Sequence, residues 1–251
     1  MRELTLFLSP GLIHVWDGII GAIDPARFRD FYTILDDSEQ RRADRFRFEQ
    51  HRIHFVSCRA WLRLLLSAYT GQHPGEIELT SSEYGKPRLN EYPPNTGLVF
   101  NVSHSCERMA FAFGLDCMLG VDIEQTRNMR YLEAMVNRIC SETEQATWRK
   151  IPKDRQLEYF FSMWVRKEAI IKAQGQGISL GMRDCELANN FENLLSLPDP
   201  CGKVQNWTLF DLPCAEGYQG AIAVNSPNSC LVRRALPEQK LFDLYLSRTL
   251  D

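Results

Sequence analysis

Hydrophobic residues recur along this chain with two periods, the alternation typical of strands and the three-to-four-residue spacing typical of helices. Strands are predicted at 4–8, 12–16, 97–103, 109–114, 119–124, 207–212 and 220–225. Helices are predicted from near Pro25, from Ser38 or Glu49 to Tyr69, over 129–149, over 155–174, and in the tail from Pro237. This mixture, without a regular strand–helix alternation, predicts an α+β fold.

Two segments far apart in the chain share a pattern. Phe55-Val-Ser-Cys-Arg-Ala-Trp and Phe160-Phe-Ser-Met-Trp-Val-Arg each belong to an amphipathic helix that ends at a glycine and precedes a strand region. The repetition indicates two related α+β halves meeting near residue 125. No linker rich in Gly, Ser or Pro separates them, so we expect the halves, 1–124 and 125–251, to share an interface.

The predicted helix over 155–174 carries a carboxylate within its apolar stripe. Leu157, Phe161, Trp164, Glu168 and Ile171 follow one another at helical spacing. Burying an unpaired charge is costly, so Glu168 is expected to meet a cation, a metal or strong donors. The alternative is a rim position at which Glu168 reaches solvent and pairs with Lys172, one turn further along.

The predicted strand 119–124 places two carboxylates on one side. Because side chains alternate in a strand, Asp122 and Glu124 face together while Val121 and Ile123 face the other way. Paired carboxylates are ligands that suit Mg²⁺, which also takes water and substrate phosphates. A solvent-facing strand edge explains the same pattern. Together with Glu168, the pair becomes a candidate three-carboxylate site.

The charge of the chain limits which kinds of partner it can bind. The net charge of -3 and the pI near 6.0 provide no global basic field, which argues against nucleic acid. Arginines nevertheless crowd the first quarter of the chain, and such a patch fits either a small anion with several phosphates or a solvated helix face. They are Arg41, Arg42, Arg45, Arg47, Arg52, Arg59 and Arg63.

The eight cysteines form no CxxC pair and show no metal-ligand spacing. The first residues read as a strand rather than as a signal peptide, and no apolar run approaches the thickness of a bilayer. We therefore expect a reduced, cytoplasmic protein that does not use a membrane.

The histidines offer weaker signals. Phe100-Asn-Val-Ser-His-Ser105 ends a strand with polar groups able to bind an anion, although a lone histidine such as His104 is more often structural. His51 and His54 are spaced to share a helix face and bind a transition metal, but no third ligand accompanies them.

Four motifs in register resemble a known family. They are Tyr84-Gly85-Lys86-Pro87, Phe100-Asn-Val-Ser-His-Ser105, Gly120-Val-Asp-Ile-Glu124, and Trp164-x-x-Lys167-Glu168-x-x-x-Lys172-x-x-Gly175-x-Gly177. Their order and separation resemble those of the 4'-phosphopantetheinyl transferases of the surfactin-synthetase-activating (Sfp-type) family. The resemblance covers essentially the whole chain, because these enzymes are about this long and consist of two similar halves.

The resemblance implies a reaction and a metal. The phosphopantetheine arm of coenzyme A would move to a serine hydroxyl of an apo acyl or peptidyl carrier protein, with release of 3',5'-ADP. Asp122, Glu124 and Glu168 would hold Mg²⁺ against the pyrophosphate, and Lys172 would contact the phosphates. Glu168 resembles the family's general base, although a water on Mg²⁺ is an alternative acceptor of the serine proton.

The resemblance also implies contacts to coenzyme A and an architecture. Lys86 and Pro87 would lie along the adenine and ribose, and Ser103 and His104 would meet the 3'-phosphate. Arg59 and Arg42 would lie near the same phosphate. Each half would pack a small antiparallel sheet on a long helix, with the active site in the cleft between the halves.

Carrier docking is expected on 125–131, where Arg127, Met129 and Arg130 offer basic and apolar groups to an acidic carrier. A chain that supplies both halves of its own site is expected to be a monomer. Two other classes stay open: a Mg²⁺-dependent nucleotide or pyrophosphate hydrolase using the same carboxylates, and a non-enzymatic module that binds carriers or coenzyme A.

Overall fold

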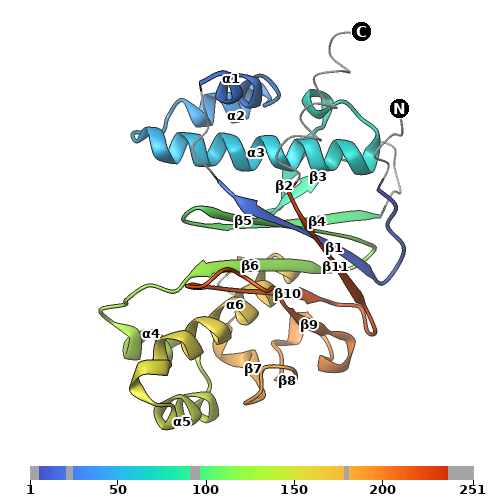
Figure 1. Ribbon diagram of the computed structural model, residues 1–251. Helices are drawn as coiled ribbons and strands as arrows, with labels where there is room; N and C mark the ends of the chain where they lie inside the picture. The colour runs from blue at the N-terminus through green and yellow to red at the C-terminus, as the bar shows by residue number, and fades with distance from the viewer. Residues whose placement is uncertain (1–5, 21–24, 91–96, 178–180, 237–251) are drawn as a thin grey trace.

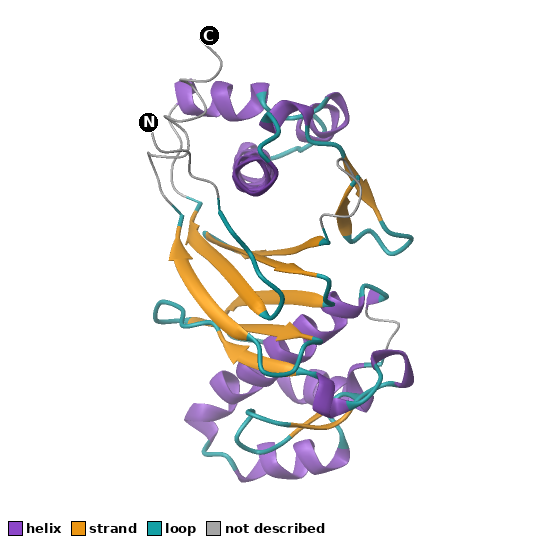
Figure 2. Ribbon diagram, turned by 90° about the vertical axis from the view of Figure 1, so that its right-hand side faces the viewer, coloured by secondary structure: helices purple, strands orange, loops and turns teal. Residues whose placement is uncertain are grey.

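The computed structural model describes residues 6–20, 25–90, 97–177 and 181–236. Two sheets lie face to face in the middle of the molecule, and a long helix covers the outer face of each (Figures 1 and 2). The predicted α+β class is confirmed. None of the helices in these ranges combines the length and the apolar character needed to cross a membrane.

The first sheet has the strand order β11-β1-β5-β4. Its strands are β1 (Leu12–Ile19), β4 (Leu98–Ser105), β5 (Arg108–Leu115) and β11 (Cys230–Ala235). All neighbours are antiparallel except β1 and β11, which are parallel. Helix α3 (Glu49–Thr70) lies across this sheet and ends at Gly71, whose φ of 74° few other residues adopt readily.

The second sheet is the antiparallel set β6-β10-β9. Its strands are β6 (Leu119–Gln125), β10 (Tyr218–Val224) and β9 (Thr208–Asp211), and helix α6 (Gln156–Gln174) crosses it. Gly120 of β6 lies so close to α6 that a Cβ there would be 1.9 Å from the carbonyl oxygen of Ala169. Strand β6 and helix α6 are therefore in backbone contact beside the predicted site residues.

Three apolar clusters hold the layers together. One packs α3 on the first sheet and another packs α6 on the second. The third lies between the sheets and includes Val15, Ala112, Val121 and Ile222, all with no exposed surface. Burial of apolar surface on both faces of each sheet is the main favourable contribution to this stacked arrangement.

The sheets do not follow the predicted division at residue 125. Strand β6 precedes that boundary but belongs to the second sheet, and β11 follows it but completes the first sheet. Each half of the chain thus contributes one strand to the other half's sheet. The division into 1–124 and 125–251 stays a prediction, and so does the similarity of the halves.

The remaining elements lie around these layers. They are α1 (Pro25–Thr33), α2 (Asp37–Ala43), β2 (Leu79–Ser81), β3 (Pro87–Leu89), α4 (Leu132–Ile139), α5 (Glu142–Lys150), β7 (Glu186–Leu187) and β8 (Leu194–Ser196). The single helix expected over 129–149 is wrong, because Ser141 forms a capping box with Glu144 and starts a new helix there. Residues 6–8 are not in a strand as expected, and the predicted tail helix lies outside the described residues.

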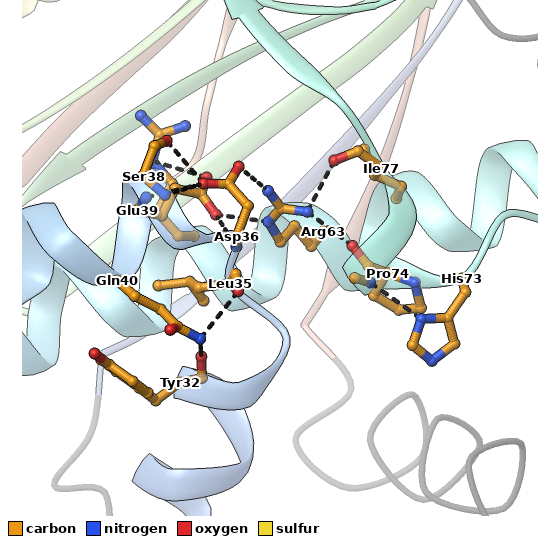
Figure 3. Close-up of polar contacts among 12 residues, drawn as sticks. Tyr32, Leu35, Asp36, Ser38, Glu39, Gln40, Arg63, His73, Pro74 and Ile77 are labelled. Atoms are coloured by element: carbon orange, nitrogen blue, oxygen red, sulfur yellow. Dashed lines mark hydrogen bonds and ion pairs between the residues drawn. The ribbon is translucent and has the colours of Figure 1, made fainter.

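A buried arginine fixes the short elements above the first sheet (Figure 3). Arg63 of α3 has no exposed side-chain surface, and its guanidinium donates to the carboxylates of Asp36 and Glu39 and to the carbonyls of Pro74 and Ile77. Asp36 and Glu39 also form the capping box of α2. One side chain therefore links α3, α2 and the turn that leads to β2.

A buried lysine has the matching position in the other layer. Lys167 of α6, also without exposed surface, donates to Glu144 at 2.6 Å and to the carbonyls of Ile139 and Met182. Glu144 in turn accepts the backbone N–H of Leu187. A buried charge is tolerated only with such partners, so these contacts fix α6 against α4, α5 and β7.

Candidate active site

A ladder of side chains joins the two sheets along β6. Strand β6 is an edge strand, so one set of its backbone N–H groups has no β partner. Alternate side chains of β4 accept these hydrogen bonds at 2.9, 3.2 and 3.1 Å. The pairs are Asn101 with Val121, Ser103 with Ile123, and Ser105 with Gln125. The polar pattern of 101–105 thereby holds β6 against the first sheet.

The same serines orient the two strand carboxylates. Ser103 Oγ donates to Asp122 Oδ1 at 2.9 Å, and Ser105 Oγ donates to Glu124 Oε2 at 2.6 Å. Asp122 is 2 % exposed and Ser103 is 4 % exposed. The two predicted same-side carboxylates are therefore real neighbours in a protected site, and each has its own hydroxyl donor.

Helix α6 brings a cation and a third carboxylate to this strand. Lys172 Nζ donates to Asp122 Oδ1 at 2.6 Å and to Ser103 Oγ at 2.8 Å. Burial, followed by the negative charges of Asp122 and Glu124, raises the pKa of Glu168 to about 7, although Lys172 opposes the shift. Lys172 forms its ion pair with Asp122. The alternative, in which Glu168 reaches solvent and pairs with Lys172, is therefore not observed.

The carboxylate oxygens of this site are ligands of the kind that a divalent cation prefers. Asp122 Oδ2 is buried and has no hydrogen-bond partner among the described residues, which is costly for a carboxylate oxygen. Burial and the neighbouring Asp122 charge also raise the pKa of Glu124, while the Ser105 hydrogen bond lowers it. Within the described ranges no three Asp, Glu, His or Cys side chains form a ready-made metal cluster. Glu124 and Glu168 would have to turn toward Asp122 to share an ion.

A separate pocket of about 450 Å³ opens beside these groups. One wall is a single face of α3 and the other is formed by β4 and the start of β3. The lining residues are Arg42, Phe46, His51, His54, Phe55, Cys58, Arg59, Leu62, Pro87, Val102 and His104. Cations and aromatic rings together suit a ligand with an anionic group and a flat heterocycle.

His104 lies between the pocket and the carboxylates. Its pKa is lowered first by burial and then by the positive charges of Lys172, His54 and Arg59. Lys172 is the side chain that binds Asp122, whereas His54 and Arg59 line the pocket. His104 therefore connects the two parts of the candidate site electrostatically.

Comparisons with known proteins match both halves of the chain. A family model described as 4'-phosphopantetheinyl transferase, N-terminal, matches residues 24–113, and one described as 4'-phosphopantetheinyl transferase superfamily matches 118–223. The 4'-phosphopantetheinyl transferase HetI of a Nostoc species is 31% identical over 223 residues, which are 88% of this chain and 90% of that protein. The chain belongs to the 4'-phosphopantetheinyl transferase superfamily.

Further relatives carry the same family name. The 4'-phosphopantetheinyl transferase Sfp of Bacillus subtilis is 28% identical over 176 residues, covering 68% of this chain and 76% of that protein. AcpT of Escherichia coli is 34% identical over 143 residues, or 51% and 70% of the two chains. The family and the enzyme class predicted from the four sequence motifs are confirmed.

Most of the site residues predicted for this phosphopantetheinyl transferase lie together. Asp122, Glu124 and Glu168, here called the carboxylate cluster, lie close enough to influence one another's charge, and Lys172 is paired with Asp122. Four of the six predicted nucleotide contacts line the pocket. Those four are Arg42, Arg59, Pro87 and His104. Their individual roles stay predictions.

Two predicted nucleotide contacts have other partners in this transferase. Ser103 bonds to Asp122, Ile123 and Lys172 and is buried, so its predicted phosphate contact would require it to release them. Lys86 Nζ donates to the carbonyl oxygens of Leu119 at 3.0 Å and Ala173 at 2.9 Å, and burial lowers its pKa to about 8. Its ammonium thus ties the β2–β3 hairpin to β6 and α6.

Sequence reasoning missed several pocket residues of this transferase. His51 and His54 were assessed as a metal pair rather than as part of an anion pocket, and Phe46 and Phe55 were not singled out. The spacing from His51 to Arg59 on one helix face was a usable signal. No sequence signal could have identified the residues of the opposite wall, because their place in the pocket depends on how α3 packs over β4.

Proposed function

We propose that this chain transfers the 4'-phosphopantetheine arm of coenzyme A to a serine hydroxyl on an apo acyl or peptidyl carrier protein. The observation that carries the proposal is the adjacency of a cation-lined pocket and a carboxylate cluster, joined by His104 and Lys172. The pocket suits the nucleotide end of coenzyme A, and the cluster suits its pyrophosphate. The site then lies at the junction of 1–124 and 125–251.

In this reaction the carrier serine oxygen bonds to the phosphorus next to the pantetheine, and the bond from that phosphorus to the bridging oxygen breaks. The departing group is 3',5'-ADP. Its developing negative charge is offset by Lys172, which the buried Asp122 and Ser103 hold in place. Lys172 therefore acts on the departing group rather than on the serine.

Asp122, Glu124 and Glu168 are the residues that would hold Mg²⁺, and the buried Asp122 Oδ2, which has no hydrogen-bond partner among the described residues, is the oxygen with a lone pair left to offer. When bound, the ion neutralises charge on the pyrophosphate oxygens. Ser103 and Ser105 keep two of these carboxylates oriented. Without a bound ion, burial and the charges of Asp122 and Glu124 raise the pKa of Glu168 to about 7, so a Glu168 carboxylate that does not ligate the ion is a suitable acceptor of the serine proton near neutral pH.

The carrier protein docks on residues 125–131 in this proposal. Arg127 and Arg130 are exposed, and the guanidinium of Arg130 lies 5.4 Å from the ring centre of Tyr131, which is 65% exposed. These groups follow β6 directly, so an acidic carrier bound there has its serine near Asp122 and Glu124. Exchanging Arg127 and Arg130 for Glu should raise the KM for carrier protein by about tenfold or more and leave coenzyme A binding unchanged. Unaltered carrier kinetics would exclude this surface.

The decisive experiment is mass spectrometry of an apo acyl carrier protein incubated with this protein, coenzyme A and Mg²⁺, with and without EDTA. A metal-dependent mass gain of about 340 Da, the phosphopantetheine arm, is expected. A parallel reaction with an apo peptidyl carrier protein identifies the carrier class. Consumption of coenzyme A while both carriers stay unmodified would indicate the hydrolase instead. If neither carrier nor coenzyme A changes, the proposal is wrong.

A further inference from the structure

The β2–β3 hairpin forms part of the pocket wall but is too short to hold its own position. Its two strands have three residues each, and an isolated pair of that length is not stable in water. Leu79 and Leu89 pack the hairpin against the apolar cluster between α3 and the first sheet. Pro87, at the start of β3, lines the pocket. The place of this wall therefore depends on what else holds the hairpin.

Lys86, the residue before Pro87, joins the hairpin to the second layer. Its Nζ donates to the carbonyl oxygen of Leu119, the first residue of β6, at 3.0 Å, and to that of Ala173, in the last turn of α6, at 2.9 Å. The last carbonyls of a helix lack partners within the helix, and a cation is favoured at this end. A side chain 87 positions earlier in the chain thus caps the C-terminal end of α6.

The surrounding backbone leaves room for this lysine. Gly120 lies against α6, where an added Cβ would be 2.6 Å from the backbone nitrogen of Ala173. A Cβ on Gly175, whose φ is 83°, would lie 3.2 Å from Cδ of Lys86 and press on its stem. Lys86 therefore binds at the junction where β6 and α6 meet, and the two glycines keep that junction narrow and open to it.

The ammonium of Lys86 is committed to these carbonyls. Burial, followed by the charge of Arg88, lowers the pKa of Lys86 to about 8, so the group is still mostly a cation at neutral pH. A buried cation is tolerated only when its donors are used, and two of its three are used here. Turning toward a ligand phosphate would break both hydrogen bonds and release the hairpin from α6.

These contacts lie between the two parts of the candidate site. Lys86 precedes Pro87 of the pocket wall, and Ala173 follows Lys172, which binds Asp122. We propose that Lys86 is a positioning residue that latches the pocket wall to the end of α6, sets the spacing between the nucleotide and the reacting groups, and binds no phosphate itself. This inference rests on the proposed function, because it assumes that the pocket receives the nucleotide end of coenzyme A.

The first test compares turnover with nucleotide binding. Lys86→Met keeps the stem and removes the donors, and it should lower kcat for carrier modification by about 10–100-fold, because a shift of about 1 Å between reacting groups has an effect of this size. Calorimetry without metal should show a loss of affinity for 3',5'-ADP of less than about threefold, since the other pocket residues stay in place. Lys86→Arg, which keeps a cationic donor, should recover most of the lost kcat.

The second test needs no substrate. Hydrogen exchange of the ligand-free, full-length protein, followed by mass spectrometry, should be faster in Lys86→Met over 82–90 and over 171–175, because the hairpin and the end of α6 lose their shared contact. Arg88→Met is the matched control, since it removes an exposed cation from the same hairpin. Its exchange and its kcat should equal those of the wild type. Should Lys86→Met not fold, the shorter and uncharged Lys86→Gln replaces it in both tests.

Two results would overturn the inference. Unchanged exchange together with an equal loss of kcat and of 3',5'-ADP affinity would show that Lys86 binds the ligand instead of the hairpin's neighbours. Wild-type exchange and wild-type kcat in Lys86→Met would show that there is no latch. A wild-type protein that modifies no carrier defeats the proposed function instead, and the exchange measurement then decides alone whether Lys86 holds the hairpin.

Discussion

Helices α3 and α6 are anchored in the same way but present different side chains to the candidate site. Each crosses one sheet, and each buries one cation, Arg63 or Lys167, without exposed surface. Each cation binds the third residue of a capping-box helix, Glu39 in α2 or Glu144 in α5, and two backbone carbonyls. The same device thus anchors both helices to their outer layers.

The faces that these helices turn toward the site differ. Helix α3 presents His54 and Arg59 to a pocket, whereas α6 presents Glu168 and Lys172 to the carboxylates of β6. The comparison teaches that the two helices solve this differently. On α6 the anchor Lys167 and the site residue Lys172 point to different sides, whereas on α3 the anchor Arg63 lies one turn from the pocket residue Arg59, and both contact Glu39. In the proposed reaction α3 binds the nucleotide and α6 supplies the reacting groups, and substitutions should separate these two proposed functions.

The largest effect is expected on the α6 side. Glu168→Gln and Asp122→Asn should each lower kcat by roughly a thousandfold, because several kcal/mol of charge stabilisation is lost. Binding of 3',5'-ADP without metal should change far less than kcat, since most of the pocket proposed to bind the nucleotide belongs to α3 and β4. Steady-state kinetics and calorimetry measure the two quantities. A variant that keeps a tenth of its activity in Mg²⁺ would contradict these roles.

The two buried cations provide the next test. Lys167→Met and Arg63→Met should each lower the free energy of unfolding by about 3–5 kcal/mol, because the buried carboxylate of Glu144 or Glu39 loses its nearest cation. Urea denaturation followed by circular dichroism measures the loss. Adding Glu144→Gln to Lys167→Met should restore part of it. A loss below about 1 kcal/mol for either single variant would show that the helices are not anchored in the same way.

A smaller effect is expected from the hydroxyls that orient the carboxylates. Ser103→Ala and Ser105→Ala should each weaken binding of Mn²⁺, used as a probe for Mg²⁺, by about 10–100-fold. Ser162→Ala, which removes a hydroxyl bonded to Gln219 on the same layer, serves as the control. Electron paramagnetic resonance of free Mn²⁺ gives the affinity. Equal behaviour of all three variants would remove Ser103 and Ser105 from the metal site.

The smallest effect concerns stability and pH in the presence of EDTA. The folded-state pKa of Glu168, about 7, lies above its usual value of 4.5, so the folded protein binds more protons than the unfolded chain between these values. Stability is therefore lost as pH rises through this window. Glu168→Gln should raise Tm at pH 8 by about 2–4 °C and have no such effect at pH 4. Calorimetric scans at both pH values check the sign.

Most residues of the candidate site could be predicted from local sequence patterns. The misplaced carboxylate at Glu168 and the same-side pair Asp122 and Glu124 were visible because helix and strand periods determine which side chains share a face. The break between α4 and α5 was missed, although Ser141 and Glu144 have capping-box spacing, because apolar residues recur at helical spacing on both sides of the break.

Contacts between segments far apart in the chain could not be predicted from the sequence. Nothing local shows that Ser103 bonds to Asp122 and to the backbone of Ile123, since that contact depends on how two sheets face one another. The histidine wall of the pocket depends on the same arrangement. Pairing of residues 230–235 with β1 likewise joins segments more than two hundred positions apart.

That pairing has a consequence for how the chain folds during synthesis. Strand β1 leaves the ribosome early, but the strand that covers its outer edge, β11, emerges only after residue 230. Until then β1 keeps an open row of backbone groups able to pair with another chain. A fragment that stops at residue 124 keeps that edge permanently. The first sheet is therefore complete only after residues 230–235 have been made, and a fragment of 1–124 lacks one of its four strands.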